Sequence, residues 1–331
     1  MTKVDIISGF LGAGKTTFIK QLVQDVFAGE KLVLIENEFG EIGIDGGFLK
    51  DAGIEITEMN SGCICCTLVG DFSKALVKVL DEYKPDRVII EPSGVGKLSD
   101  VARAIEDVKK DADIEIEGRI TIVDGKKAKM YLKNFGEFFK DQVEHASTIV
   151  VSRTQMMTDE KVEDCVKMLR EENEKAAIIS TPWDQLGKEA IQHALHAGAE
   201  IEGLFEDKEG HGHHEHHHDH DHECGCGCGH DHDHHHHHHA DDVFTSWGKE
   251  TAHKYTEEEL DLILKALSET DGYGTILRSK GIIAMEDGTW RQFDLVPEEY
   301  ETRECQADYT GRICVIGTDL KEEDLMKLFH L

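Results

Sequence analysis

Residues 6–18 read Ile6-Ile7-Ser8-Gly9-Phe10-Leu11-Gly12-Ala13-Gly14-Lys15-Thr16-Thr17-Phe18, and Gly9 through Thr16 follow the pattern G-x-x-x-x-G-K-T. This pattern is typical of the phosphate-binding loop (P-loop) of nucleoside triphosphatases. A predicted strand at Val4–Ile7 precedes the loop, and an amphipathic helix follows it, with apolar side chains at Phe18, Ile19, Leu22, Val23, Val26 and Phe27. Because both flanks are those that the motif requires, we expect a P-loop rather than an ordinary glycine-rich turn.

Each residue type in the motif has a role in binding a nucleotide. The glycines let backbone N–H groups turn toward phosphate oxygens, and the following helix directs its positive dipole end at them. Lys15 would reach the β- and γ-phosphates as a catalytic residue, and the Thr16 hydroxyl would be a ligand of Mg²⁺. The predicted phosphate-binding set is Gly9, Gly12, Ala13, Gly14, Lys15, Thr16 and Thr17.

As far as Ile179, short apolar runs alternate with helical patterns. Strands are predicted at Val4–Ile7, Leu32–Ile35, Val88–Ile90, Ile120–Val123, Ile149–Val151 and Ala177–Ile179. A helix is predicted from the spacing of Leu68, Phe72, Ala75, Leu76, Val79 and Leu80. This alternation predicts an α/β fold whose mainly parallel sheet has helices on both faces. A nucleotide would then bind at the carboxyl ends of the strands.

The composition limits the classes of function. Of the 331 residues 39% are apolar, which is enough for a sizeable core and for two domains. Asp and Glu number 67 against 36 Lys and Arg, and the net charge of −31 argues against a nucleic-acid partner. No apolar run approaches the roughly 18 residues of a membrane helix, and the first strand begins too early for a signal peptide. We therefore expect a cytoplasmic protein whose nine cysteines are thiols or metal ligands rather than disulfides.

An acidic, glycine-containing segment follows the second predicted strand. It reads Glu36-Asn37-Glu38-Phe39-Gly40-Glu41-Ile42-Gly43-Ile44-Asp45. An acidic run of this kind is often a solvated loop, but this one leaves the sheet at the edge where Mg²⁺ and phosphate would lie. We therefore interpret it as a switch segment that a bound triphosphate orders.

Three thiols lie close together ahead of the next predicted helix, in Asn60-Ser61-Gly62-Cys63-Ile64-Cys65-Cys66-Thr67. A helix N-terminus favours thiolate over thiol, and thiolates bind soft or borderline metals such as Zn²⁺ or Cu⁺. A single cysteine is usually a small buried apolar residue, an interpretation that suits a C-x-C-C cluster poorly. Three sulfurs leave the fourth position of a tetrahedral site to a carboxylate or water, which suits metal transfer better than structure.

A further predicted strand ends in Glu91-Pro92-Ser93-Gly94, an E-x-x-G pattern. In P-loop enzymes a second acidic motif closes a strand and holds Mg²⁺ or its water, and a glycine amide contacts the γ-phosphate. Glutamate commonly ends strands, so the pattern is informative only because it follows a P-loop. It predicts a catalytic role for Glu91 and a phosphate contact for Gly94.

Taken together, GFLGAGKTT, ENEFGEIGID, SGCICC and EPSG resemble the CobW-like family of metal-trafficking P-loop GTPases, relatives of the urease and hydrogenase nickel-insertion GTPases. Two later stretches, residues 275–281 and 311–317, resemble the family's C-terminal domain. The resemblance implies a transferable metal site formed by Cys63, Cys65, Cys66, Glu36 and Glu41. It also implies a GTPase that binds GTP and Mg²⁺ and delivers Zn²⁺, or Co²⁺ as the next choice, to a client metalloprotein.

The chain departs from the family pattern where the base is read. After the strand at Ile149–Val151 the family has Asn-Lys-x-Asp, whose carboxylate accepts two hydrogen bonds from guanine, whereas this segment is Ser152-Arg153-Thr154-Gln155. An amide oxygen at Gln155 replaces the bidentate carboxylate and weakens that contact. Arg153 can stack on the base as the family's lysine does. Ser152, Arg153 and Gln155 remain predicted nucleotide contacts, and GTP remains the expected nucleotide, with its preference over ATP left open.

Between Glu206 and Asp242 the composition changes completely. Sixteen of the 21 histidines lie between His211 and His239, among acidic residues, glycines and Cys224, Cys226 and Cys228. A segment so poor in apolar residues cannot bury a core, so we expect a disordered linker. Neutral imidazoles bind metals, and the internal position and mixed composition distinguish the tract from a purification tag. We interpret it as an accessory metal-binding tract of low selectivity.

The residues after this tract predict a small α+β domain. Its strands are expected at Val243–Trp247, Ile276–Met285, Trp290–Val296 and Ile313–Ile316, and its helices at Thr256–Ser268 and Lys321–Phe329. Cys165, Cys305 and Cys314 have no neighbours at ligand spacing and are predicted to be structural. The expected domains are a P-loop GTPase domain at 1–205, a linker at 206–242 and a CobW-like C-terminal domain at 243–331.

The sequence therefore predicts a GTP-dependent metallochaperone in which the nucleotide state sets the metal affinity of the C-x-C-C site. Two alternatives remain open: a metal-storage protein that uses the histidine tract, and an accessory protein for cobalt insertion in corrinoid synthesis. We expect no nucleic-acid or membrane partner, and the sequence leaves open whether the chain forms a homo-oligomer.

Overall fold

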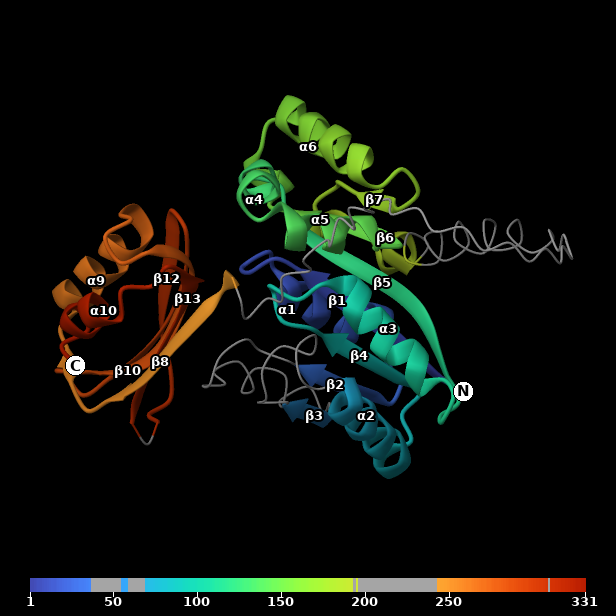
Figure 1. Ribbon diagram of the computed structural model, residues 1–331, viewed down its shortest axis with the longest axis horizontal. Helices are drawn as coiled ribbons and strands as arrows, with labels where there is room; N and C mark the ends of the chain where they lie inside the picture. The colour runs from blue at the N-terminus through green and yellow to red at the C-terminus, as the bar shows by residue number, and fades with distance from the viewer. Residues whose placement is uncertain (37–54, 59–68, 193–194, 196–242, 309) are drawn as a thin grey trace, which may run out of the picture.

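The computed structural model contains two β-sheets, shown with their helices in Figure 1. It describes residues 1–36, 55–58, 69–192, 195, 243–308 and 310–331. Within these ranges no helix is both long enough and apolar enough to cross a bilayer.

The first sheet is built from the N-terminal part of the chain. Its order is β3-β2-β4-β1-β5-β6-β7, and every neighbouring pair is parallel. The strands are β1 (Thr2–Gly9), β2 (Leu32–Glu36), β3 (Glu55–Glu58), β4 (Arg87–Glu91), β5 (Ile114–Asp124), β6 (Thr148–Ser152) and β7 (Ala177–Ile179). All the strands predicted for this part of the chain are present, so the predicted α/β fold with a parallel sheet is confirmed.

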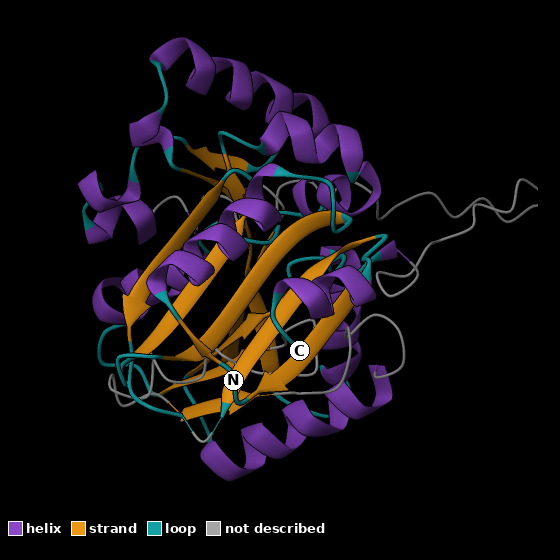
Figure 2. Ribbon diagram, turned by 90° about the vertical axis from the view of Figure 1, so that its left-hand side faces the viewer, coloured by secondary structure: helices purple, strands orange, loops and turns teal. Residues whose placement is uncertain are grey.

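Helices lie on both faces of this sheet (Figure 2). Neighbouring strand residues point to opposite faces, so Ile6 packs in one buried apolar cluster and Ile7 packs in another with Phe18. The longer helices are α1 (Lys15–Gln21), which continues as the π-helical turn η1 (Leu22–Val26), α2 (Val69–Tyr83), α3 (Leu98–Val108), α4 (Ala128–Asn134), α5 (Gly136–Glu144) and α6 (Asp159–Glu172). The short 3₁₀ turns η3 (Thr154–Met156) and η4 (Trp183–Gln185) follow β6 and β7.

The parallel arrangement brings the ends of several strands to one edge of the sheet. β1 ends at Gly9, where the P-loop begins, and its neighbour β4 ends at Glu91. Glu36 ends β2 and lies in register with Glu91 on β4. The segments predicted to contact phosphate and Mg²⁺ therefore start from the same edge, as expected for this class of fold.

A buried ionic cluster lies away from that edge. The guanidinium of Arg87, the first residue of β4, donates hydrogen bonds to the carboxylates of Asp5 and, at 2.7 Å, Glu30, and it forms an ion pair of 2.7 Å with Glu117. It also lies 3.9 Å from the ring centre of Phe27. Burial raises the pKa of Asp5 to about 6, although Arg87 acts in the opposite direction.

The second sheet belongs to the C-terminal part of the chain. Its order is β12-β11-β10-β13-β8, with the short strand β9 paired to β10. Its strands are β8 (Thr245–Thr251), β9 (Lys254–Tyr255), β10 (Thr275–Met285), β11 (Trp290–Val296), β12 (Glu299–Glu304) and β13 (Gly311–Thr318). Helices α9 (Glu257–Glu269) and α10 (Glu322–Leu328) bury a separate apolar cluster against one face, which includes Trp247, Leu264 and Leu325. The predicted small α+β domain is confirmed.

The opposite face of the second sheet packs against the first part of the molecule. Phe244, Leu277, Cys314 and Ile316 belong to the same buried cluster as Phe10. The ring of Phe244 lies 4.9 Å from that of Phe138 and 6.3 Å from that of Phe10, measured between centroids. Because Phe10 directly follows β1, this contact joins the second sheet to the beginning of the P-loop. Figure 1 accordingly shows the second sheet beside the carboxyl ends of the parallel strands.

Three strands were not predicted from the sequence: the two-residue strand β9 and the edge strands β3 and β12. β3 reads Glu-Ile-Thr-Glu, and β12 reads Glu-Tyr-Glu-Thr-Arg-Glu with most residues exposed. Both lie at the edge of their sheets, where a strand needs few apolar residues. The first strand of the second sheet also begins at Thr245 rather than at Val243, because Phe244 packs in the cluster described above.

Candidate functional site

The P-loop has the backbone conformation that its glycines permit. Gly12 has a φ of +70° and Gly14, the residue before α1, a φ of +101°. A side chain would be strained at either position. Trp183 in η4 lies behind the loop, because a Cβ at Gly14 would come within 3.3 Å of its ring. The backbone oxygen of Trp183 also accepts a hydrogen bond of 3.0 Å from Gln21 on α1. The contact of Trp183 with the P-loop was not predicted, because no sequence pattern relates Trp183 to the P-loop.

Lys15 is buried, and its ammonium group points back over the loop. Nζ donates to the carbonyl oxygen of Gly9 at 2.9 Å and to that of Phe10 at 3.5 Å. Thr16 and Thr17 follow on α1 and line a cleft together with Gly12, Gly14, Lys15 and Glu91. The structure therefore brings together most of the predicted phosphate and Mg²⁺ residues, whereas Gly9 and Ala13 pack behind the cleft.

The E-x-x-G loop packs directly against the P-loop. A Cβ at Gly94 would come within 2.7 Å of the Leu11 side chain and 3.0 Å of the Leu11 nitrogen. The Gln142 amide on α5 donates 2.8 Å to the Gly96 oxygen and 3.3 Å to that of Gly94. These contacts fix the loop that follows Glu91. Glu36, the neighbour of Glu91 in register, is buried.

Arg153, in the segment after β6, connects three parts of the molecule. Its φ is +62°, and its Nε lies 3.2 Å from Oδ2 of Asp124 at the end of β5. Nη2 donates to the Gly12 oxygen at 3.5 Å, and Nη1 donates to Glu299, the first residue of β12. Burial raises the pKa of Asp124, and the charge of Arg153 opposes this shift. The other two predicted base contacts lie elsewhere: Ser152 is buried with its hydroxyl on the Val123 oxygen, and Gln155 is exposed.

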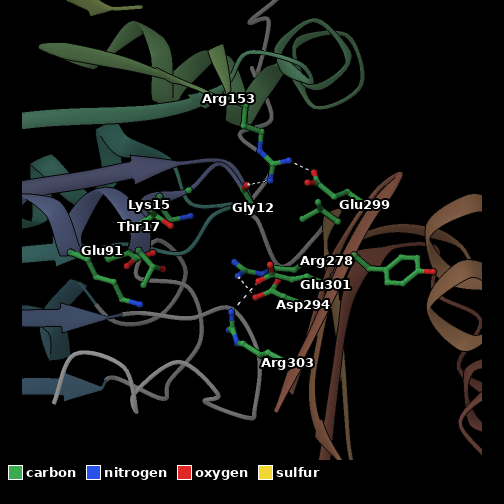
Figure 3. A pocket seen from close by; sticks show the side chains of 15 residues that line it. Gly12, Lys15, Thr17, Glu91, Arg153, Arg278, Asp294, Glu299, Glu301 and Arg303 are labelled. Atoms are coloured by element: carbon green, nitrogen blue, oxygen red, sulfur yellow. Dashed lines mark hydrogen bonds and ion pairs between the residues drawn. The ribbon is translucent and has the colours of Figure 1, made fainter. Parts of the chain in front are cut away.

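The second wall of the cleft comes from the C-terminal sheet (Figure 3). It is formed by residues of β10, β11 and β12: Arg278, Asp294, Val296, Glu299, Tyr300, Glu301 and Arg303. Arg278 pairs with Asp294 at 3.3 Å, and Arg303 pairs with Glu301 at 3.0 Å. Sequence reasoning missed these residues. The available signal was the pair of charges, Arg278 and Lys280, the only charged residues of strand β10.

Several predicted metal ligands lie outside the described residues. These are Glu41, Cys63, Cys65, Cys66 and the whole His211–His239 tract with Cys224, Cys226 and Cys228. In the part of the chain that the structure does describe, no three His, Cys, Asp or Glu side chains are placed to hold one metal ion. Cys165 and Cys314 are buried, and burial raises the pKa of the Cys165 thiol to about 11.

Both halves of the chain match known protein families. Residues 3–180 match the family described as CobW/HypB/UreG, nucleotide-binding domain, and residues 244–330 match the cobalamin synthesis protein cobW C-terminal domain. A relative from Sinorhizobium named zinc chaperone CobW is 41% identical over 126 residues, which are 36% of this chain and 35% of that protein. The chain thus spans about a third of that relative's length.

A second relative matches over most of the chain. The zinc-regulated GTPase metalloprotein activator 1 of Schizosaccharomyces pombe is 25% identical over 315 residues, which are 90% of this chain and 76% of that protein. Among solved structures, the Zn(II)-bound YjiA GTPase from E. coli aligns over 99% of this chain and 98% of its own, at 19% identity and a TM-score of 0.44.

Proposed function

Because the chain belongs to the CobW/HypB/UreG family of nucleotide-binding proteins, we propose that it is a GTP-dependent metallochaperone. The main support is that the P-loop follows β1 at the same edge of the parallel sheet where Glu91 ends β4 and Glu36 ends β2. The C-x-C-C motif lies between β3 and α2 in the sequence. The names of its relatives, zinc chaperone and zinc-regulated GTPase metalloprotein activator, favour Zn²⁺ as the transported ion and a metalloprotein as the client. Co²⁺ is the next candidate.

The residues that line the cleft support the binding of a triphosphate. Lys15 would exchange its two carbonyl acceptors for β- and γ-phosphate oxygens, which bear full negative charge and accept stronger hydrogen bonds. Thr16 and Glu91 offer the oxygen ligands that Mg²⁺ prefers, and both line the cleft. When bound, Mg²⁺ would neutralise charge on the phosphates. Glu91 would also hold the attacking water, and the loop at Gly94 would contact the γ-phosphate.

The base-reading segment is weaker for guanine than the usual motif. Arg153 would lie beside the base, whereas the exposed Gln155 supplies one amide oxygen in place of a carboxylate. Replacing Gln155 with Asp should therefore increase the preference for GTP over ATP by about tenfold or more. Competition binding with both nucleotides measures the ratio, and Gln185→Asp on η4 is a control for added surface charge. An unchanged ratio would remove Gln155 from the base site.

The coupling of nucleotide to metal is the central test of the proposal. Binding of the triphosphate would order the segment from Glu36 onward and bring Glu36 and Glu41 to Cys63, Cys65 and Cys66. A ten-thousandfold change in metal affinity would need about 5.5 kcal/mol of differential binding, so we expect a smaller change that client docking completes. Zn²⁺ and Co²⁺ affinities should be measured with GDP and with a non-hydrolysable GTP analogue. Equal affinities in the two states would refute the coupling.

Two cysteine variants test whether the C-x-C-C motif, rather than another thiol, binds the metal in a nucleotide-dependent way. Cys65→Ala should abolish the nucleotide-dependent part of metal binding, whereas Cys305→Ala removes a half-buried thiol of the second sheet and should leave it intact. A pull-down with wild type and Cys65→Ala, combined with metal analysis, then identifies the client.

Metal storage is a second function, favoured by the composition of residues 211–239. Deletion of these residues distinguishes the two. A chaperone keeps metal-stimulated hydrolysis with a reduced total metal content. A storage protein loses most of its bound metal and keeps no metal dependence of hydrolysis.

A further inference from the structure

The C-terminal sheet touches the P-loop itself. A Cβ added at Gly12 would lie 2.3 Å from Cγ1 of Val296, the last residue of β11. The side chain of Val296 therefore fills the space directly above the loop residue whose carbonyl also accepts from Arg153. This contact fixes the distance between the sheet face and the phosphate-binding residues.

Strand pairing then places an arginine next to this contact. Ser279 on β10 pairs with Leu295 on β11, so Arg278 is the cross-strand neighbour of Val296 and shares its face. Asp294 lies two residues before Val296 on that face and forms the 3.3 Å ion pair with Arg278. Figure 3 shows the guanidinium of Arg278 extending from the sheet toward the side of the cleft that carries Lys15, Thr17 and Glu91.

We propose that Arg278 is a catalytic residue for triphosphate hydrolysis, supplied to the P-loop by the C-terminal sheet of the same chain. This inference rests on the proposed GTPase function. In the reaction, a water oxygen forms a bond to the γ-phosphorus while the bond from that phosphorus to the β–γ bridging oxygen breaks. The bond's electron pair stays on the β-phosphate, and the water proton passes to a phosphate oxygen. Arg278 remains protonated and donates hydrogen bonds to the oxygens on which charge accumulates.

The chemistry of the pair favours this role. A guanidinium presents several N–H groups in a fixed plane, which match two phosphate oxygens as well as they match a carboxylate. Asp294 holds Arg278 at the edge of the cleft until a triphosphate offers a more highly charged acceptor. The Arg278 side chain is only 16% exposed, so water competes weakly for it, whereas the Arg303 side chain is 41% exposed.

An arginine that acts on the transition state changes kcat, whereas one that only holds the sheet changes stability. Arg278→Ala should lower kcat for GTP by about 10²- to 10³-fold with KM changed less than about fivefold. Arg278→Lys should restore little, because an ammonium lacks the planar fork. Arg291→Ala is the matched control: it removes a guanidinium of β11 that pairs with Glu257 and Glu304 outside the cleft, and it should keep wild-type kcat.

A binding measurement gives a readout that does not depend on turnover. GDP with aluminium fluoride imitates the charged transition state, and the affinity gained over GDP alone should fall at least tenfold in Arg278→Ala. Asp294→Ala distinguishes a catalytic from a purely structural role of Arg278. If the ion pair only stabilised the sheet, Asp294→Ala and Arg278→Ala would lower activity equally. The proposal instead expects Asp294→Ala to retain at least tenfold more activity than Arg278→Ala.

The outcomes distinguish this inference from the function on which it rests. Equal kcat in wild type and Arg278→Ala, or equal losses in Arg278→Ala and Asp294→Ala, would overturn the role of Arg278. Absence of hydrolysis in the wild type, with and without Zn²⁺, would instead overturn the proposed GTPase function.

Discussion

Substitution of Gly12 by alanine tests the contact between the P-loop and the second sheet. The φ of +70° costs a residue with a side chain about 1–2 kcal/mol. The new Cβ would also lie 2.3 Å from Val296 Cγ1, and relief of such an overlap in a packed site costs about 1–3 kcal/mol. We therefore expect Gly12→Ala to destabilise the protein by roughly 2–5 kcal/mol.

Two further variants divide this cost into its parts. Gly29→Ala has the same kind of backbone strain, with a φ of +93° and no atom within 4 Å of the new Cβ, so it should cost only the strain. Val296→Ala removes Cγ1 and leaves Val296 Cβ at 3.4 Å, an acceptable distance. The combination of Gly12→Ala with Val296→Ala should therefore recover about 1–3 kcal/mol relative to the sum of the single losses.

The assay is urea denaturation of the four variants and the wild type without nucleotide, followed by tryptophan fluorescence. The double-mutant cycle yields the coupling between residues 12 and 296 directly. A coupling below about 0.5 kcal/mol would show that residues 12 and 296 are not in contact in solution. The second wall of the cleft, and the role of Arg278, would then lose their structural basis.

Three other substitutions or measurements test separate features. Phe244→Ala should cost about 3–5 kcal/mol in urea denaturation if its ring packs against Phe10, but under 0.5 kcal/mol if the two sheets are apart in solution. The pKa of Asp5, raised from 3.8 to about 6 by burial, means that the folded protein binds more protons than the unfolded chain between these values. This group's contribution to stability should therefore fall by at most about 3 kcal/mol as the pH rises from 4 to 6, and the difference between wild type and Asp5→Asn should show this slope. Cys165, with a pKa of about 11, should resist iodoacetamide at pH 8 until urea exposes it, as mass spectrometry of labelled peptides would show.

Much of the fold could be predicted because it depends on local patterns. The P-loop motif identifies the turn between β1 and α1, and the buried strands β2, β4, β5 and β6 appear as apolar runs that no exposed loop would carry. The edge strands β3 and β12 gave no comparable signal: β12 consists almost entirely of polar residues, most of them exposed. Its existence follows from pairing with β11, which is a tertiary property.

The candidate site was predictable only on the side of the P-loop. Lys15, Thr16 and Glu91 are fixed by short motifs, and the parallel sheet brings them to one edge. Arg278 and Glu299 reach the same cleft through packing of Phe244 and Val296, which lie far from the P-loop in the sequence. Nothing in their spacing indicates that position. Arg153 was predicted from the sequence as a base contact, and that role stays a prediction; its hydrogen bond to the Gly12 oxygen and its ion pair with Glu299 needed the structure.

The composition of the cleft has a consequence for biosynthesis. One wall contains residues between Gly12 and Lys20 together with Glu91 and Arg153, and the other contains residues between Arg278 and Arg303. At about 5–20 residues per second, a ribosome needs roughly a quarter of a minute to a minute to make the chain between these walls. During this interval the parallel sheet can fold and the P-loop can meet cellular nucleotide, but the cleft has no second wall. A nascent chain would therefore bind nucleotide before it gains the arginine proposed to hydrolyse it, so hydrolysis would begin only after synthesis has passed the histidine tract and the second sheet has docked.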